Sequence, residues 1–316
     1  MMKSWSVCAA LVLATVGVSS VVRGEFTTAV AGQGLSSTDG NVNKTPFDIV
    51  ETDNANGSKS LVGSGFEQRQ TVGAGATINA FAGGEGTAFA SGGTVKVKVQ
   101  TSAYTSIPLL YAPRVTANFG ASFVDTVTLT VPTGSGLNVG DPVSYQVRWV
   151  LDGVTNSPYY YSGYHYPLGT ISAYFSVYSG AEFKAGTGFN LPPYEGYTIA
   201  SVYAIDVPYV VSGVVGEELR VSASLGLGAD NRSGLILDGS ATGYGDQSTV
   251  MDFSNTMHVY LDPVTVGLGF SAESLHNYAS NAGPDGPGGP GNGVPEPATV
   301  GIVGVGMVFL LGRRRR

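Results

Sequence analysis

Cysteine is almost absent from this 316-residue sequence, which contains only Cys8. This residue lies within an apolar run near the N-terminus, so processing after that run would remove it. The remaining chain then has no thiol for a disulfide or a cysteine-based metal site. Its stability must come from packing, and 43% hydrophobic residues can fill a core at this length.

Charge is also scarce, and positive charge is scarcest in the body of the chain. Only 12% of residues are charged. Residues 25–297 contain ten Lys and Arg against 23 Asp and Glu, a net charge of −13. Such a surface repels a phosphate backbone, and Lys96 with Lys98 is too short to form a basic stripe. We therefore expect no nucleic-acid partner.

Motifs of the common catalytic classes are missing. The three histidines, His165, His258 and His276, form no H-E-x-x-H pair, no serine stands in G-x-S-x-G, and no phosphate-binding glycine loop follows an expected strand. Glu217 and Glu218 are adjacent, so on a strand they would point to opposite faces. We expect a non-enzymatic protein without a cofactor. A secreted hydrolase, with a carboxylate pair assembled from distant residues, is an alternative.

Calcium is the one metal that the sequence leaves open. The residues after Asp39 do not form an EF-hand, because Lys44 stands at the sixth position and Val50 at the twelfth. An irregular calcium-binding loop would use Asp39, Asp48 and Asp53.

Alternation with a period of two dominates the sequence between residues 26 and 278. In residues 95–99 valines alternate with lysines, and in residues 143–151 apolar residues alternate with polar ones. Further strands are expected at 126–131, 171–178, 198–207, 219–227, 250–253 and 257–261. About ten to twelve short strands with Gly- and Asp-rich turns predict an all-β body, an antiparallel β-sandwich or a jelly-roll-like fold.

Two segments of the body interrupt this pattern. Residues 73–93 are rich in Gly and Ala, so we expect an edge strand or irregular strands there. Residues 39–60 are polar and rich in Asn, and we expect a loop. No fixed repeat length supports the alternative of a solenoid.

The N-terminal segment has the layout of a secretory signal peptide. Lys3 provides a positive start, residues 7–18 are apolar, and small residues follow. Cleavage is expected after Ser20 or after Gly24, so the secretion machinery is an expected partner. The expected organisation is a signal peptide at 1–24, a body at 25–280, a Gly/Pro-rich linker at 281–293 and a sorting segment at 294–316.

The C-terminal segment combines three features in a fixed order. Pro295, Glu296 and Pro297 precede residues 298–312, which carry no charge and are expected to form a single transmembrane helix of about 22 Å. Four arginines follow: Arg313, Arg314, Arg315 and Arg316. The positive-inside rule places them in the cytoplasm and the body outside, with the inner membrane as the expected partner.

This order of tripeptide, short apolar segment and arginine cluster resembles the PEP-CTERM sorting signal. The resemblance covers residues 295–316 and implies recognition of the tripeptide by an exosortase, a membrane-embedded transpeptidase-like enzyme. It further implies removal of the tail and delivery of the body to the cell surface or an exopolysaccharide matrix, as for other removed C-terminal anchors. An uncleaved single-pass anchor is the alternative. The linker at 281–293 would hold the body away from the membrane.

A cluster of tyrosines lies between Pro158 and Pro167. Five tyrosines fall within residues 159–166, and exposed tyrosine offers a flat apolar face with a polar tip. Packing of these rings onto the body would explain the cluster. The functional hypothesis is a carbohydrate-binding module in which Tyr159, Tyr161 and Tyr164 contact a polysaccharide, as the alternative to a structural or adhesive role.

Overall fold

The computed structural model describes eleven stretches of the chain. They are residues 26–38, 45–46, 48–53, 57–73, 76–105, 113–156, 169–191, 201–232, 234–235, 241–242 and 247–280. The expected signal peptide, linker and sorting segment lie outside these ranges.

Every regular element in these ranges is a β-strand, and every strand pair is antiparallel, which confirms the prediction of an all-β body. One seven-stranded sheet, sheet A, has the order β10 (Glu182–Leu191), β9 (Gly169–Ser179), β12 (Glu218–Arg232), β7 (Arg114–Thr130), β1 (Thr27–Ser37) and β2 (Thr45–Pro46), with β16 (Gly269–Ala272) also paired to β7. The other, sheet B, has the order β11 (Ser201–Val214), β8 (Pro142–Asn156), β15 (Gln247–Pro263), β6 (Thr94–Thr105), β5 (Ala76–Ser91), β4 (Lys59–Gly73) and β3 (Asp48–Asp53). A two-stranded sheet joins β13 (Gly234–Leu235) to β14 (Ala241–Thr242).

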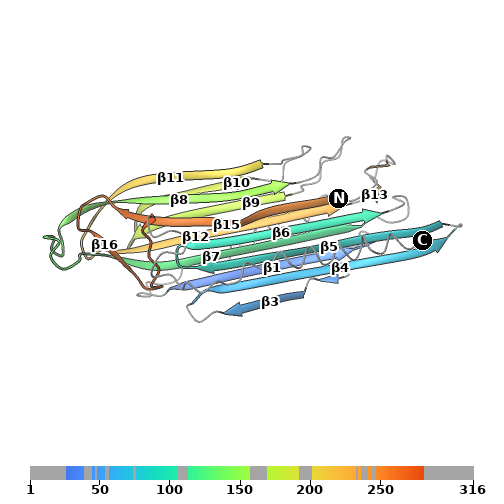
Figure 1. Cartoon of the computed structure of the whole chain (residues 1–316), viewed down its shortest axis with the longest axis horizontal. Coiled ribbons are helices and arrows are strands. Elements are labelled where there is room, and N and C mark those ends of the chain that lie inside the picture. The colour runs from blue at the N-terminus through green and yellow to red at the C-terminus, as the bar shows by residue number, and fades with distance from the viewer. Residues whose placement is uncertain are drawn as a thin grey trace.

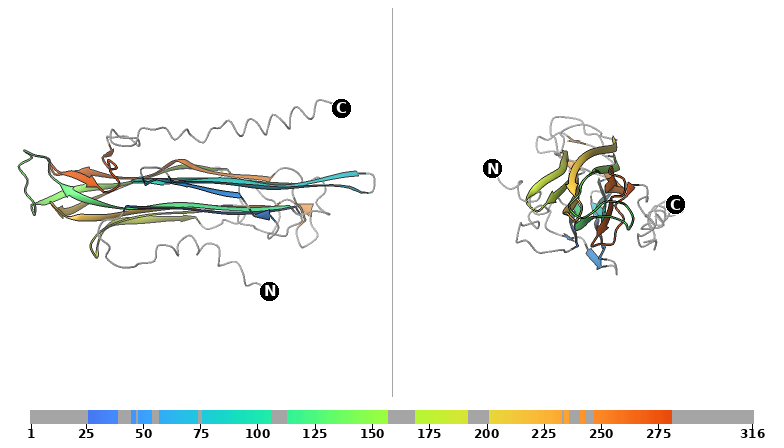
Figure 2. Two further views of the ribbon diagram at one scale, coloured as in Figure 1. Left: turned by 90° about the horizontal axis from the view of Figure 1, so that it is seen from below. Right: turned by 90° about the vertical axis from the view of Figure 1, so that its left-hand side faces the viewer.

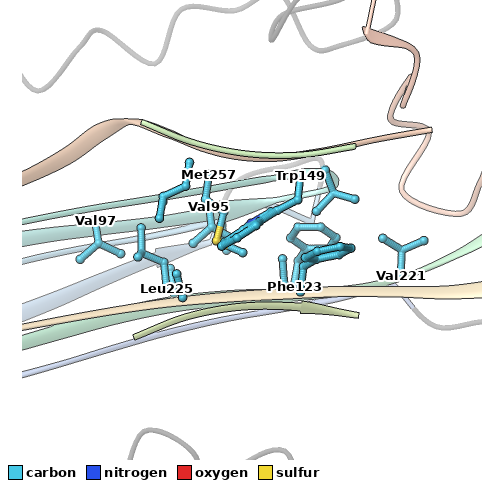
Figure 3. Packing of buried hydrophobic residues seen from close by; sticks show 14 of the residues in the cluster. Val95, Val97, Phe123, Trp149, Val221, Leu225 and Met257 are labelled. Carbon is cyan, nitrogen blue, oxygen red and sulfur yellow. The ribbon is translucent and has the colours of Figure 1, made fainter. Parts of the chain in front are cut away.

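The two large sheets face each other along the length of an elongated molecule (Figures 1 and 2). Strands β1, β7 and β12 of sheet A lie opposite β4, β5 and β6 of sheet B. Side chains from both sheets meet between the layers, where Trp149 of β8 lies near Phe123 of β7 (Figure 3). This is the interdigitated packing of two sheets around one core.

Burial alternates along the strands as the sequence predicts. In β8 the inward side chains are Val143, Tyr145, Val147, Trp149 and Leu151, all buried. Their neighbours on the other face are partly exposed. Period-two alternation therefore identified the correct face of this strand.

The prediction for residues 73–93 was wrong. Most of this segment forms β5, which pairs with β4 on one side and with β6 on the other. Glycine here serves packing, because a Cβ at Gly86 would collide with the ring of Phe119 from the facing sheet. The loop predicted at residues 39–60 was also partly wrong, since it contains β3 and the start of β4.

Two further strand boundaries differ from the prediction. The segments expected at 250–253 and 257–261 belong to the single strand β15, which has register shifts between them. The strand expected at 198–207 is β11, which runs on to Val214.

The outer strands of both sheets carry features that hinder pairing with another chain. Strand β2 has two residues and includes Pro46, while β3 has six exposed residues with three acids. Strand β10 has a register shift around Lys184. Pro208 lies within β11, whose pairing with β8 continues past it, so its missing N–H faces the open edge. Proline, charge and bulges of this kind discourage strand addition.

Candidate functional site: the exit segment and the sorting segment

The exit segment, residues 264–280, follows β15 and completes sheet A. Its strand β16 pairs with residues 127–130 of β7, on the edge where β1 pairs further along. Before β16, the Val264 and Thr265 amides both donate to the Ser144 carbonyl, and the Ser144 amide donates to Thr265 Oγ1 at 2.8 Å. The chain is thus fastened to both sheets as soon as β15 ends.

The last residues of the exit segment complete sheet B. Strand β6 begins at Thr94, beside His258 of β15, and the Val259 amide donates to the Gly93 carbonyl at 3.0 Å. Beyond that point Leu261 N donates to Tyr278 O at 2.8 Å, and Ser280 N donates to Asp262 Oδ1 at 2.8 Å. Residues 278–280 therefore satisfy backbone and side-chain groups that β6 leaves open.

A buried carboxyl group, that of Asp125, holds the exit segment from inside. Asp125 is fully buried on β7, and Tyr278 is 1% exposed. Asp125 accepts hydrogen bonds from the Ser274 amide at 3.2 Å, from the Ser274 hydroxyl and from the Tyr278 hydroxyl at 2.8 Å. A buried acid with several donors is stable, whereas loss of its donors would leave a costly unpaired group. We call Asp125, Ser274, His276 and Tyr278 the exit cluster.

The imidazole of His276 closes the exit cluster. It meets the Tyr278 ring edge-on, with centroids 4.8 Å apart, and occupies the space that a Cβ at Gly93 would need. Gly93 also has a φ of 69°, which favours glycine. Burial lowers the pKa of His276, although the Asp125 carboxylate acts in the opposite direction. Burial and the same carboxylate raise the pKa of Tyr278, so the phenol stays protonated as a donor.

Sequence reasoning missed the exit cluster, although one signal for it was present. Asp125 lies an even number of residues from Phe123, Val127 and Leu129 on the same strand, and these three side chains all point inward. An acid at a position where the alternation predicts an inward, apolar side chain indicates a buried polar site. Its partners come from about 150 positions further along the chain, which parity alone does not reveal.

The residues predicted to act in sorting and in glycan contact lie outside the described residues. These are Pro295, Glu296, Pro297, Arg313, Arg314, Arg315 and Arg316, together with Tyr159, Tyr161 and Tyr164. Among the residues that the structure describes, no helix has the length and apolarity needed to cross a membrane.

The predicted calcium ligands are not gathered in the described part of the chain. Asp48 and Asp53 lie at opposite ends of β3, and Asp53 pairs with Lys59 at 3.3 Å. Asp39 lies outside the described residues. Within those residues no group of three His, Cys, Asp or Glu side chains is arranged to hold a metal ion.

Comparison with known families identifies the segment that follows the linker. Residues 293–316 match the family model described as the PEP-CTERM protein-sorting motif. These residues are a PEP-CTERM sorting motif. The motif implies an exported protein that is transiently anchored in the membrane and processed by an exosortase, a membrane enzyme. No curated protein and no solved structure matches the chain.

The exit segment gives the PEP-CTERM motif a defined attachment to the body. Thirteen residues, 281–293, join Ser280 to the segment that begins at Val294. Fully extended, they span at most about 45 Å. Any force on the linker reaches the body through residues that are hydrogen-bonded to both sheets. This attachment suits a protein that is anchored and processed at its C-terminal segment.

Proposed function

We propose that this protein is a non-enzymatic structural or adhesive protein of the cell surface or exopolysaccharide matrix. A signal peptide at residues 1–24 directs export, and a helix at 298–312 with Arg313–Arg316 holds the chain in the membrane. An exosortase then acts at Pro295, Glu296 and Pro297, and the body is released or transferred. The match of residues 293–316 to the sorting motif is the observation that carries this proposal.

The build of the body supports a role outside the cell. The core lies between two sheets whose outer strands are hindered from pairing. Such a body can be abundant in a matrix without associating through its edges. The segment next to the linker is also fastened to both sheets.

A single carboxyl-to-amide change in the sorting motif tests recognition. Cells would express the wild type, Glu296→Gln, or the matched control Glu218→Gln, whose side chain is exposed on β12. We expect wild type and control to lose both terminal segments and to appear outside the cytoplasmic membrane. Glu296→Gln should accumulate in the membrane with its tail intact.

Fractionation and intact mass provide the readout, and a strain without the processing enzyme provides the reference. The Glu296→Gln protein should have the same mass as the wild type from that strain. Identical processing of Glu296→Gln and Glu218→Gln would contradict recognition of the tripeptide. Recovery of the wild type from the cytosol with both termini intact would contradict the whole proposal.

Glycan contact by Tyr159, Tyr161 and Tyr164 is a second candidate function. It is favoured by the concentration of five tyrosines within residues 159–166. Binding of the wild type to a polysaccharide array, compared with a triple alanine variant, tests it. Equal binding by the two proteins would contradict it.

A further inference from the structure

Three aromatic side chains lie on the outer face of sheet B, at the end of the molecule away from the exit segment. Phe66 of β4 is 69% exposed, and Phe81 of β5 and Tyr104 of β6 are partly exposed. Phe81 is the direct cross-strand partner of Tyr104, and Phe66 is the partner of Gly83. Their neighbours Ala80, Ala82 and Ala103 are buried in the core, so the three rings share the outer face. We call Phe66, Phe81 and Tyr104 the distal aromatic patch.

Glycine at position 83 leaves room for the Phe81 ring next to Phe66. A Cβ at Gly83 would lie 2.5 Å from Phe81 Cζ and 3.3 Å from Phe66 Cβ. The Phe81 ring therefore lies over the backbone of Gly83, beside Phe66, instead of standing away from the sheet. The Phe81 ring is also partly exposed, and exposed aromatic side chains can stack on another flat surface.

The surroundings of the distal aromatic patch are polar but carry little charge. The outward neighbours are Ser64, Gln68, Gln100, Ser102 and the acid Glu85. Charge complementarity disfavours a strongly anionic ligand here, because the outward neighbour Glu85 is negative and residues 25–297 have a net charge of −13. Hydroxyl and amide groups around exposed rings match a neutral ligand with apolar faces and hydroxyl edges.

The patch also lies where an anchored protein would meet its surroundings. Ser248 of β15 and Phe66 belong to one row of cross-strand partners that runs across sheet B. Asp262, further along β15, accepts a hydrogen bond from the Ser280 amide of the exit segment. The thirteen residues between these two positions span roughly 40 Å. The exit segment and the free ends of β4 and β5 thus lie at opposite ends of the molecule (Figure 1).

The described ends of the tyrosine-rich segment lie at this same distal end. Asn156, the last residue of β8, is in the cross-strand row that contains Gln100 and Glu85. Gly169, the first residue of β9, pairs with Ala229 near the distal end of β12. Two aromatic features of the sequence therefore connect to one end of the body.

We infer that the distal aromatic patch binds a neutral polysaccharide, with pyranose rings stacked on Phe66, Phe81 and Tyr104 and their hydroxyls bonded to Gln68 and Gln100. This inference rests on the proposed function, because it names the chemical class that an exported, tail-processed body would contact. The hindered edges favour contact through a face over strand addition.

A comparison of alanine variants on the two sheets tests the inference. The full-length chain, purified in detergent, would be applied to an array of neutral glucans, mannans, galactans and chitin, with alginate as the acidic probe. We expect binding to at least one neutral polysaccharide that is insensitive to salt. The Phe66→Ala/Tyr104→Ala variant should bind it about tenfold or more weakly.

Tyr174→Ala is the matched control, since the Tyr174 ring lies over Gly188 on the outer face of sheet A. This variant should bind as the wild type does. Because Phe66 is largely exposed, Phe66→Ala alone should keep the wild-type thermal midpoint and still weaken binding. It separates loss of the patch from loss of the fold.

Several results would overturn the inference. They are no binding to any neutral probe, salt-sensitive binding to alginate alone, equal binding by wild type and Phe66→Ala/Tyr104→Ala, or equal losses in that variant and in Tyr174→Ala. Loss of binding only in a Tyr159/Tyr161/Tyr164 triple alanine variant would assign binding to that segment instead. Correct tail processing without glycan binding would end this inference alone, whereas glycan binding with unprocessed tails would end the proposed sorting alone.

Discussion

The two halves of the sandwich core are packed in different ways. In the distal half, Phe119 of β7 fills the space between the sheets, and a Cβ at Gly32 or Gly63 would lie 2.8 Å or 2.7 Å from its ring. Gly86 makes a still closer approach. In the exit half the space is shared by large side chains from both sheets. For example, Trp149 stacks on Phe175 with ring centroids 5.5 Å apart.

This difference shows two solutions to the same spacing between sheets. One large ring can be accommodated if its neighbours lack a Cβ atom, as Gly32, Gly63 and Gly86 do around Phe119. Alternatively, several large side chains interlock, and a polar group such as Asp125 can be enclosed with its donors. The packing between Gly32, Gly63 and Gly86 therefore depends on the Phe119 ring, whereas the exit half combines contacts among large side chains with a hydrogen-bonded cluster.

The largest effect is expected from Phe119→Ala in the distal half. Glycines cannot refill the space, so the variant should lose about 3–5 kcal/mol of unfolding free energy. Urea denaturation followed by circular dichroism measures this loss. Phe183→Ala, at a side chain that is 56% exposed, should be nearly neutral. A loss under about 1 kcal/mol for Phe119→Ala would show that the distal core does not depend on this ring.

The next effect is expected from Asp125→Asn in the exit half. An amide cannot accept from all the donors that face Asp125, so the variant should lose about 1–3 kcal/mol. Limited proteolysis should also cut residues 264–280 faster than in the wild type. Asp152→Asn, an exposed acid on β8, is the control. Unchanged proteolysis would mean that the exit cluster does not hold this segment.

A comparable effect is expected from Gly86→Ala, which adds one methyl group against Phe119. Overpacking should cost about 1–3 kcal/mol. In the Gly86→Ala/Phe119→Leu double variant the smaller Leu side chain makes room for the added methyl group. The stability loss in the double variant should therefore be smaller than the sum of the losses in the two single variants. A double-mutant cycle measures this coupling. Strict additivity would contradict the contact between these two positions.

The smallest effect concerns the pH dependence of the exit half. Burial lowers the pKa of His276. The contribution of the neutral imidazole to folding stability is therefore fully present above the ordinary histidine pKa of about 6.5, and it is lost as the pH falls through the lowered pKa. The wild type should therefore lose stability on going from about pH 7.5 to about pH 5.5, and His276→Gln should lose less. Urea midpoints at both values test this. Equal shifts in both proteins would refute it.

Carboxylates with lowered pKa values act in a different pH range, so they do not obscure this test. Desolvation raises the pKa of Asp252 and of Glu217, but their hydrogen bonds and ion pairs lower it by more, so the net pKa of each is lowered. A hydrogen bond from the Arg148 side chain lowers the pKa of Asp206. The stability that these acids contribute is lost only below about pH 4, and it is lost in both proteins.

Sequence patterns predicted the strands well where side chains alternate and poorly where glycine replaces them. Residues 143–151 of β8 were assigned with the correct inward face. For residues 73–93 the sequence predicts an edge strand or irregular strands, because glycine in a strand usually signals poor packing. In this protein Gly86 is the partner of a large ring on the facing sheet, and that partner is not visible in the local sequence.

The sequence by itself determined the all-β class, the inward face of each alternating strand and the presence of the PEP-CTERM motif, because each of these is written in residues that are close together along the chain. Only the tertiary structure decided that Gly32, Gly63 and Gly86 surround Phe119, and that Asp125 binds Ser274 and Tyr278. These contacts join residues from separate strands through the pairing and stacking of two sheets. Their chemistry depends on burial and distance, which no short stretch of sequence specifies.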